Sequence, residues 1–457
     1  MEQLDTLLLL ALASLFGLFP VLAWLFRPYA AFTFEVYVAA TVWALYFPAL
    51  FIEATSGLWR FSVQRTEYIA LFVFGCNACW MIGSVLLPIF MKQGTRPPAP
   101  PPSSDDQELR TCRRAIMGLL ALGMLGFVMQ VYALPGGIGA TSLSRVEVLD
   151  SKHAMLQLMG TYLFICTHLA LVAAGLLRKR MGSLYWISVV IAGLMCVGLH
   201  LVYRSRTQLL AFIVLLAIPY IQTHCITRLR KLTICLGLGA ALFWFAATAQ
   251  VARGSIQSGQ DAFAGAVTRL SAEELIDHSL RKSDLGNVRY FYEALECFPH
   301  GHPFLWGSSY YAWIMMPIPR SWISFKPSDT QVLFCQEVDP AMAQYGGTIP
   351  PTIYGDAYIN FGSLGVLVFL FWGMLARSWS RFGDPHDPKT WASMAALAVA
   401  GPHFARGGFS NAMCLSLAAF VLAWVLHTLA RPSLRAQLMS AAAGGRPISP
   451  LPPVRGG

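Results

Sequence analysis

The stretch SLYWISVVIAGLMCVGLHLVYRSRTQLLAFIVLLAIPYIQT, residues 183–223, holds two long apolar runs with Arg204 and Arg206 in the gap between them. Each run is close to the roughly 20 residues that cross a bilayer as an α-helix. The stretch therefore predicts a membrane hairpin of two helices with two cations at its tip. In a helix these two side chains would point about 200° apart, so we do not expect both to reach one ligand.

The rest of the chain repeats this apolar pattern. It has 457 residues, of which 56% are hydrophobic and 12% are charged, whereas a soluble domain carries about 25% charged residues. We predict an all-α polytopic membrane protein with about 11 transmembrane helices, within a range of about 10–12. The formal net charge is +10, but no basic soluble domain is expected that could bind nucleic acid. The expected spans are 6–26, 33–53, 68–91, 115–133, 159–177, 183–203, 207–223, 232–252, 357–376, 390–405 and 411–430.

Basic residues predict the orientation of these spans. They recur in alternate loops, at 92–114, 178–180, 228–231, 377–381 and 431–435. Cytoplasmic loops carry an excess of Lys and Arg, so we expect these loops inside and the N-terminus outside. The proline- and serine-rich insert is expected to be disordered. The predicted organisation is transmembrane helices 1–3 in 1–92, a disordered cytoplasmic linker in 93–114, transmembrane helices 4–8 in 115–252, a large outer loop in 253–356, transmembrane helices 9–11 in 357–430 and a cytoplasmic tail in 431–457.

The large outer loop is expected to carry short helices. The sequence SAEE is a capping box that starts a helix at Ser271. A second helix is expected from Asn287, over VRYFYEALECF, with Pro299 ending it. Cys297 and Cys335 would both be exported to an oxidising compartment, which makes a disulfide between them a candidate.

Cations on the outer face predict a binding site for an anion such as a diphosphate. Arginine offers a rigid fork of donors that suits phosphate. The alternative is that single arginines reach the lipid phosphates without a specific ligand. The outer cations are Arg145, Arg204, Arg206, Arg253, Arg289, Arg320, Lys326 and Arg406.

Acid–base candidates lie in and after the same loop. Asp356 lies at the edge of a span, where a carboxylate is a functional candidate or a charge that complements a helix N-terminus. His302, with His300 close by, could act as a base near neutral pH. No third ligand accompanies the two histidines, so we predict no metal site.

Three segments carry a family resemblance: YRSRTQLLAFIVLLAI (203–218), FPHGHPFLWGSSYYAWIMMPIPRSWISFKP (298–327) and PPTIYGDAYINFGSLG (350–365). The first is similar to a Gly-Ser-Arg-x-x-Leu-Leu opening of a span, in which Arg206 is the firm match. The second is similar to an aromatic-Gly-x-Ser-Tyr turn followed by Pro-Arg and Lys-Pro, and the third to Asp-x-Tyr-x-Asn-Phe-Gly. In this order they resemble the bacterial oligosaccharide repeat-unit polymerases, the Wzy-type O-antigen polymerases.

The resemblance implies an inverting, metal-independent glycosyltransferase of the GT-C type in the bacterial inner membrane, with its active site facing the periplasm and without a cofactor. It would join undecaprenyl-diphosphate-linked glycans, with undecaprenyl diphosphate as the leaving group. Membrane lipids surround it, and a chain-length regulator and a flippase are candidate partners. The candidate base is Asp356, followed by Glu293 or His302. Candidate diphosphate ligands are Arg206, Arg320, Lys326 and Arg406, then Arg204 and Arg253, and candidate substrate contacts are Tyr310, Tyr358, Asn360 and Arg289.

Two rival functions remain open from the sequence. An O-antigen ligase of the same GT-C class would use the same donor but a lipopolysaccharide-core acceptor. A lipid-linked oligosaccharide flippase would line a path through the membrane midplane with charges, whereas the charges here are expected at one face.

Overall fold

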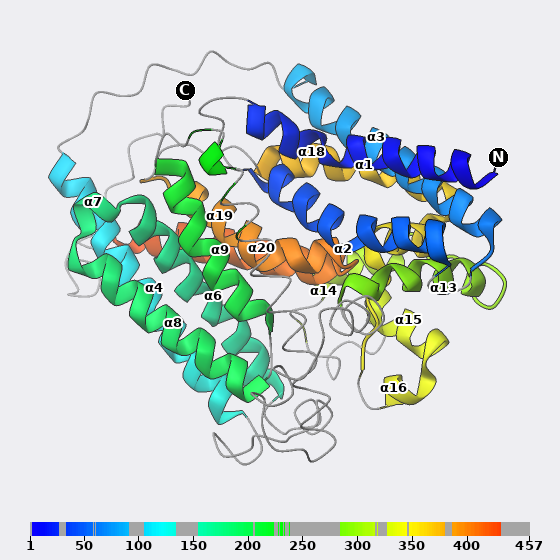
Figure 1. Ribbon diagram of the computed structural model, residues 1–457. Helices are drawn as coiled ribbons and strands as arrows, with labels where there is room; N and C mark the ends of the chain where they lie inside the picture. Colours follow the sequence, from blue (N-terminus) through cyan, green and yellow to red (C-terminus); the bar gives the residue numbers. More distant parts are fainter. Residues whose placement is uncertain are drawn as a thin grey trace, which may run out of the picture.

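The computed structural model describes residues 2–26, 33–57, 59, 61–90, 105–133, 154–203, 206–223, 227, 229–231, 233, 237, 284–315, 318, 327–344, 347–379 and 386–430. All regular elements in these ranges are helices (Figure 1). They are α1 (Glu2–Phe26), α2 (Phe34–Ser56), α3 (Val63–Phe90), α4 (Asp105–Tyr132), α6 (Ala154–Leu176), α7 (Arg178–Met181), α8 (Ser183–Tyr203), α9 (Arg206–Thr223), η2 (Asp284–Val288), α13 (Arg289–Cys297), α14 (Ser308–Met315), α15 (Thr330–Val338), α16 (Pro340–Gln344), α17 (Thr352–Phe361), η3 (Gly362–Leu364), α18 (Gly365–Trp379), α19 (Pro388–Ala405) and α20 (Phe409–Ala430).

The described helices confirm a membrane-embedded, all-α protein. Seven helical stretches are long and apolar enough to cross a bilayer: α1, α2, α3, α4, α6, the run from α17 through α18, and α20. The apolar helices α8, α9 and α19 also coincide with expected spans. The expected span at 232–252 lies largely outside the described residues. The number of about 11 spans therefore stays a prediction.

Two predicted boundaries are wrong. Helix α4 begins at Asp105, so residues 105–114, assigned to the disordered linker, are helical. Acidic residues in the first turn of a helix favour this earlier start. The expected span at 357–376 begins instead with the separate helix α17 at Thr352. Gly362, with φ of 58°, ends α17 and lets the chain turn into α18.

The helix expected from Asn287 over VRYFYEALECF is confirmed, because η2 and α13 together cover residues 284–297. Its predicted apolar face is the face that packs: Val288, Phe291 and Tyr292 are buried. The phenol ring of Tyr292 stacks on Phe61 with 4.2 Å between centroids. The helix expected from Ser271 lies outside the described residues.

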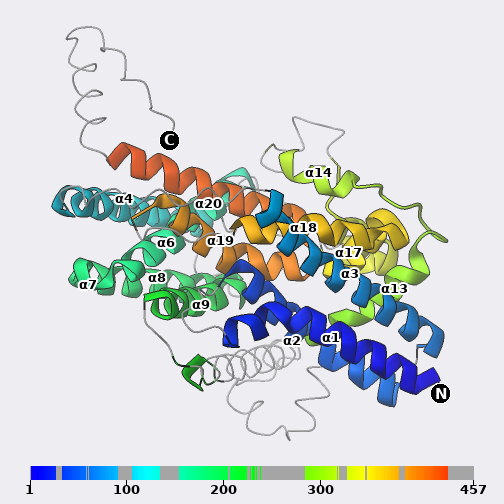
Figure 2. The same ribbon diagram turned by 90° about the horizontal axis from the view of Figure 1, so that it is seen from above.

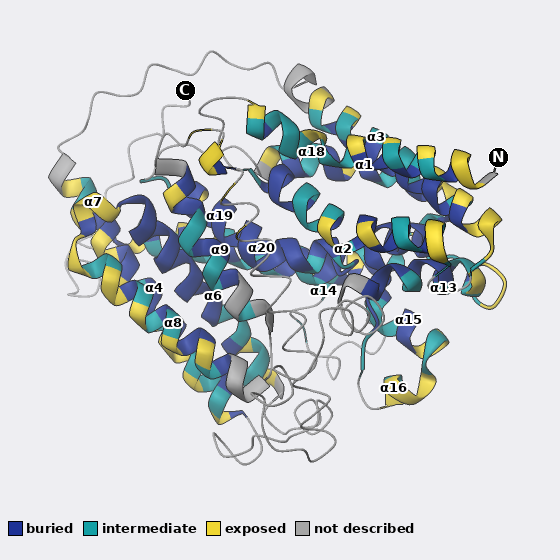
Figure 3. Ribbon diagram, viewed as in Figure 1, coloured by how far each residue is buried: buried dark blue, intermediate teal, exposed yellow. Residues whose placement is uncertain are grey.

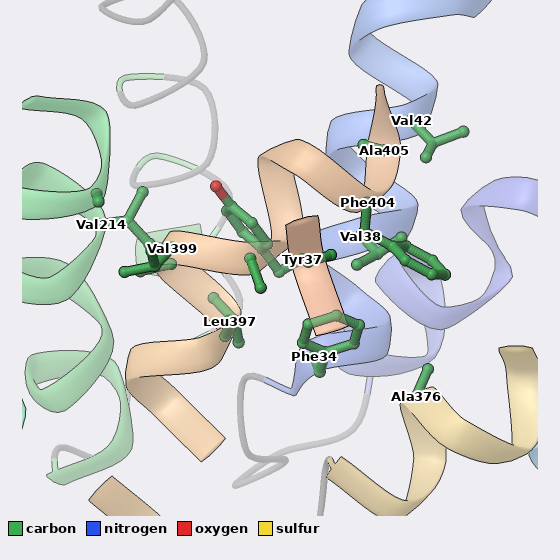
Figure 4. Close-up of a cluster of buried hydrophobic side chains, with 14 of the residues drawn as sticks. Phe34, Tyr37, Val38, Val42, Val214, Ala376, Leu397, Val399, Phe404 and Ala405 are labelled. Atoms are coloured by element: carbon green, nitrogen blue, oxygen red, sulfur yellow. The ribbon is translucent and has the colours of Figure 1, made fainter. Parts of the chain in front are cut away.

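Helix α19 is the centre of the molecule. Almost every residue of it is buried, from Thr390 to Ala405. Figure 2 shows α19 between the group of α1, α2 and α3 and the group of α4, α6 and α8. In Figure 4, Leu397 and Phe404 of α19 lie against Phe34 and Val38 of α2. The core is thus made by an apolar helix that neighbouring helices surround.

Glycines allow the tightest helix pairs. A Cβ at Gly83 of α3 would lie 2.0 Å from the carbonyl oxygen of Leu370 in α18, and one at Gly373 would lie 2.2 Å from the carbonyl oxygen of Trp80. Small residues at helix crossings are the usual means of close packing in a membrane, where hydrophobic burial between helices is weak. This contact fixes α18, and with it α17, against α3.

The outward faces of the helices are apolar. Leu8 of α1, Leu71 of α3, Leu194 of α8 and Trp424 of α20 are each more than half exposed. Figure 3 shows exposed residues along the outer sides of α1, α3, α4 and α8, and buried ones on α6 and α19. Large exposed apolar surface of this kind belongs in a lipid environment.

The two ends of the helix bundle differ. At one end, Arg113 at the start of α4 donates to the carbonyl oxygen of Arg180 in α7 at 2.8 Å. Arg377 near the end of α18 pairs with the buried Glu35 at the start of α2, at 3.4 Å. Figure 1 shows α7 and the helices α13 and α15 on opposite sides of the molecule. The basic residues expected on one side of the membrane therefore lie away from the short helices of the outer loop.

Candidate functional site

Helix α17 supports the candidate site and is buried from Thr352 to Asn360. The hydroxyl oxygen of Thr352 accepts a hydrogen bond from the N–H of Gly355 at 3.0 Å, which caps the first turn. Thr352 has φ of 72°, a left-handed conformation that costs a β-branched residue on the order of 1–3 kcal/mol. The surrounding packing must hold this start in place, and it thereby fixes where α17 directs its side chains.

Asp356, the predicted base, lies in the middle of α17 with 1% of its surface exposed. Neither of its carboxylate oxygens has a hydrogen-bond partner among the described residues. The hydroxyls of Tyr310 on α14 and Thr330 on α15 approach the carboxyl group without completing a hydrogen bond of normal geometry. Most buried polar side-chain atoms are hydrogen-bonded in native proteins. Asp356 is therefore better suited to chemistry than to a purely structural role.

A second acid, Asp329, lies beside Asp356 at the start of α15. Its Oδ2 accepts a hydrogen bond from Nδ2 of Asn411 in α20 at 3.2 Å. Burial raises the pKa of Asp329 to about 6. Burial, followed by the negative charge of Asp356, raises the pKa of Tyr310 well above its ordinary value. Two acids and a tyrosine thus meet where α14, α15, α17 and α20 converge, and they can accept or hold a proton there.

The loop between α19 and α20 brings Arg406 to the same place. Gly407 has φ of 81°, and a Cβ there would lie 2.3 Å from the carbonyl oxygen of Thr352 and 3.2 Å from the Cβ of Asp356. This close approach to α17 requires glycine. Arg406, the half-buried C-cap of α19, directly precedes it. The structure therefore brings the backbone that follows Arg406, at Gly407, against the helix that carries the predicted base.

Asn360, predicted to contact substrate, joins helices in the structure. Its Nδ2 donates to the carbonyl oxygen of Asp356 at 2.8 Å, and its Oδ1 accepts from the hydroxyl of Ser309 at 2.9 Å. The hydroxyl of Ser410 in α20 donates to the carbonyl oxygen of Ser309 at 2.7 Å. These bonds attach α14, and so Tyr310, to α17 and α20. Asn360 acts on the site by positioning its neighbours.

Glu293, His302 and Arg289 lie in a separate group around α13 and α15. Nε2 of His302 is 3.9 Å from the carboxylate of Glu337 on α15, and Arg289 donates to the hydroxyl of Tyr290 at 2.8 Å. Burial raises the pKa of Glu293, and the positive charge of Arg289 opposes that rise. No hydrogen bond or ion pair in the described part of the chain joins this group to Asp356. The three candidate bases therefore do not form one site.

The candidate disulfide between Cys297 and Cys335 is not formed, because both residues are reduced cysteines. Cys335 is buried on α15, and its Sγ faces the carbonyl oxygen of Asp339, 3.9 Å away, at the end of its own helix. Burial raises the pKa of Cys297, and the negative charge of Glu337 adds to the rise. A cysteine at a suitable place in the sequence does not fix the geometry that a disulfide requires.

Several predicted diphosphate ligands cannot be placed. Arg204, Arg253, Arg320 and Lys326 lie outside the described residues. Arg206 is the first residue of α9, and its side chain also lies outside the described part. Their role as anion ligands stays a prediction.

Three polar residues of the site, Asp329, Thr330 and Asn411, were not predicted. The sequence SDTQ before an apolar run indicates a helix start, and α15 begins there. That pattern does not show which other helix the acid will face. Asn411 had no signal beyond its position near the end of a span.

Comparisons of the chain with protein-family models, with curated proteins and with solved structures find no match. Among the described residues, no three His, Cys, Asp or Glu side chains are grouped so that they could hold a metal ion. The functional assignment consequently depends on the site itself and on the sequence resemblance.

Proposed function

We propose that the chain is a membrane glycosyltransferase that polymerises undecaprenyl-diphosphate-linked oligosaccharide repeat units, as the sequence resemblance implies. The observation that carries the proposal is the carboxyl group of Asp356. It comes from the Asp-x-Tyr-x-Asn-Phe-Gly segment, it is buried at the end of the bundle near α13–α16, and both of its oxygens lack hydrogen bonds within the described residues. A buried carboxylate at such a position is able to accept a proton from a substrate hydroxyl.

In the proposed reaction, the hydroxyl oxygen of the acceptor sugar attacks the anomeric carbon of the donor glycan. The bond between that carbon and the diphosphate oxygen breaks, and the undecaprenyl diphosphate leaves with the electron pair. The hydroxyl proton passes to the carboxylate of Asp356. Attack opposite to the leaving group inverts the configuration at the anomeric carbon.

Arg406 is suited to the leaving group in this scheme. Negative charge develops on the diphosphate as the bond breaks, and a fixed guanidinium stabilises it without reorganisation. Arg406 is next to Gly407, which packs on Asp356. Arg206, Arg320, Lys326, Arg204 and Arg253 remain further candidates for the same role.

The proposal requires that the site open for substrate, since the oxygens of Asp356 are closed from solvent. The short helices α14 and α15 cover it, and they are held to α17 and α20 by a few hydrogen bonds. The basic end of the bundle, with Arg113 and Arg180, is expected in the cytoplasm. The end with α13–α17 then faces the periplasm of a bacterial inner membrane.

The proposal is tested by incubating purified protein in lipid nanodiscs with lipid-linked repeat units from the host. We expect longer glycans that remain on undecaprenyl diphosphate. Asp356→Asn should lower the rate about 10²–10⁴-fold, the usual contribution of a general base, and Asp339→Asn serves as a control that removes a charge at the same end of the bundle.

Two results would contradict the proposal. Transfer of glycan only to a lipopolysaccharide core would indicate the ligase. Movement of the lipid-linked glycan across vesicles without any new glycosidic bond would indicate the flippase. Full activity of Asp356→Asn would remove this residue as the base even if the polymer forms.

A further inference from the structure

A shallow surface cavity of about 550 Å³, largely open to solvent, lies between the start of α3, the end of α13 and α17. Its volume falls within the roughly 300–1,000 Å³ of typical small-molecule sites. Apart from the partly buried Leu295, the residues that line it are polar or aromatic: Gln64, Arg65, Tyr68, Glu296, His300 and Tyr358. The functional assignment so far uses none of them except Tyr358, as an expected substrate contact.

Two tyrosines form the aromatic part of the cavity. The rings of Tyr68 and Tyr358 lie edge to face, with centroids 6.3 Å apart. Their hydroxyls are already bonded, Tyr68 to the hydroxyl of Ser363 at 3.0 Å and Tyr358 to the carbonyl oxygen of Phe298 at 3.2 Å. The rings are therefore held in place before any ligand binds, which lowers the entropic cost of binding. Tyr358 is 8% exposed and lies under the cavity, so the partly exposed ring of Tyr68 offers the apolar surface for the C–H groups of a sugar ring.

The polar part of the cavity is an ion pair. Nη1 of Arg65 on α3 contacts Oε1 of Glu296 on α13, and both side chains are nearly half exposed. The two charges compensate each other, so the cavity has little attraction for a phosphate. The guanidinium still offers spare donors and the carboxylate spare acceptors. A neutral ligand with many hydroxyl groups matches this combination.

The cavity and Asp356 lie on different faces of α17. Tyr358 follows Asp356 by two positions, which turns its side chain by about 200° around the helix. Accordingly Tyr358 faces α3 and α13, where it contacts Tyr68 and Phe291, whereas Asp356 faces α14, α15 and the loop at Gly407. A sugar in the cavity could not be the sugar that reacts at Asp356.

We propose that this cavity is a carbohydrate-binding subsite that holds a sugar of the glycan remote from the reacting end. The inference rests on the proposed function for the origin of the glycan, but the binding itself does not depend on catalysis. A remote subsite would retain the growing chain between additions. Its loss should shorten the polymer while leaving the joining of two single repeat units at its normal rate.

Binding is tested with saturation-transfer NMR on purified protein in nanodiscs. The probe is the one-repeat oligosaccharide of the host polysaccharide, released from its lipid by mild acid. With wild-type protein we expect saturation of the sugar ring protons. Tyr68→Ala should bind the sugar about tenfold more weakly, as for truncation of a central aromatic contact. Tyr68→Phe keeps the ring and should bind with nearly normal affinity. The double variant Arg65→Ala with Glu296→Ala, at two half-exposed positions, should also lose binding without unfolding.

The subsite is overturned if the oligosaccharide fails to bind wild-type protein, or if it binds Tyr68→Ala and the double variant with wild-type affinity. Displacement of the sugar by inorganic phosphate at equal concentration would also overturn it, in favour of an anion site at Arg65. Normal sugar binding to Asp356→Asn, together with loss of its polymer, would support both proposals. If the protein forms no polymer but binds the sugar in a way that depends on Tyr68, the subsite is supported and the proposed function is contradicted.

Discussion

Asp356 and Asn360 lie one turn apart on α17, and their surroundings give them different roles. Both are buried, but the amide of Asn360 donates and accepts hydrogen bonds to its neighbours, whereas the carboxylate of Asp356 makes none among the described residues. An unpaired buried polar group costs stability, so a protein retains one where it has a use. This contrast within one motif separates the expected base from a residue that positions it.

The pKa of Asp329 leads to a prediction about stability and pH. Burial raises this pKa from 3.8 to about 6, so between these values the folded protein holds a proton that the unfolded chain has lost. Stability should therefore fall as pH rises from about 4 to about 6, and the penalty should be complete above pH 6. Asp329→Asn removes the titration, and it should gain stability relative to wild type over this range, by on the order of 1–3 kcal/mol.

Unfolding of both proteins in detergent, followed by tryptophan fluorescence from about pH 4 to about pH 7.5, measures this difference. A difference that stays constant across the range would contradict the assigned pKa. Glu337→Gln, at an exposed acid on the same short helix, provides the control.

At the scale of elements, the site depends on the loop between α19 and α20. The loop packs Gly407 against the carbonyl oxygen of Thr352, at the strained first residue of α17. Helix α14 is attached from two sides, by Ser309 to Asn360 and by Ser410 to Ser309. The positions of Asp356, Tyr310 and Arg406 are consequently coupled, and a change in the loop should disturb all three.

Gly407→Ala tests this coupling. Alanine would have to adopt a positive φ and would also clash with backbone, so we expect a loss of stability on the order of 2–4 kcal/mol. Gly57→Ala is the matched control. Gly57 has φ of 60°, but no atom lies within 4 Å of a Cβ there, so it should cost only about 1 kcal/mol.

Thermal unfolding of the two purified variants distinguishes the cost of a positive φ, which both variants share, from the cost of the backbone clash, which only Gly407→Ala has. Equal losses of stability would show that the contact with Thr352 contributes nothing.

At the scale of the whole molecule, the bundle has a basic end and an end with short helices. Arg113 and Arg180 meet at the first, and Arg65 and Glu296 meet at the second. By the positive-inside rule, the basic end is expected in the cytoplasm and the end with the short helices outside. The periplasmic reaction proposed above requires that orientation.

Single cysteines test it with a membrane-impermeant maleimide on spheroplasts. Gln336→Cys on α15 should be labelled in intact spheroplasts, and Lys179→Cys on α7 only after permeabilisation, because both positions are exposed but lie at opposite ends. Labelling above that of the parent protein is the readout. The reverse pattern would place Asp356 near the cytoplasm and would contradict a periplasmic polymerase.

The sequence by itself determined the class of the protein, most of its helices and four residues that the structure places at or beside the candidate site: Asp356, Tyr310, Asn360 and Arg406. Apolar runs, proline stops and the apolar period of α13 are local features of the sequence. They can be recognised without knowing which helices pack together. Asp356 could be singled out because a carboxylate is costly at the edge of an apolar span.

Only the tertiary structure decided which residues meet. It separated Glu293 and His302 from Asp356, and it brought Asp329 and Asn411 close to Asp356. It also kept Cys297 and Cys335 outside any disulfide and formed a cavity from residues of α3, α13 and α17. These pairs are far apart in the chain, and their distances depend on how helices cross through contacts such as Gly83 with Leu370 and Gly407 with Thr352. Local patterns carry no information about such crossings, so the composition of the site followed from packing.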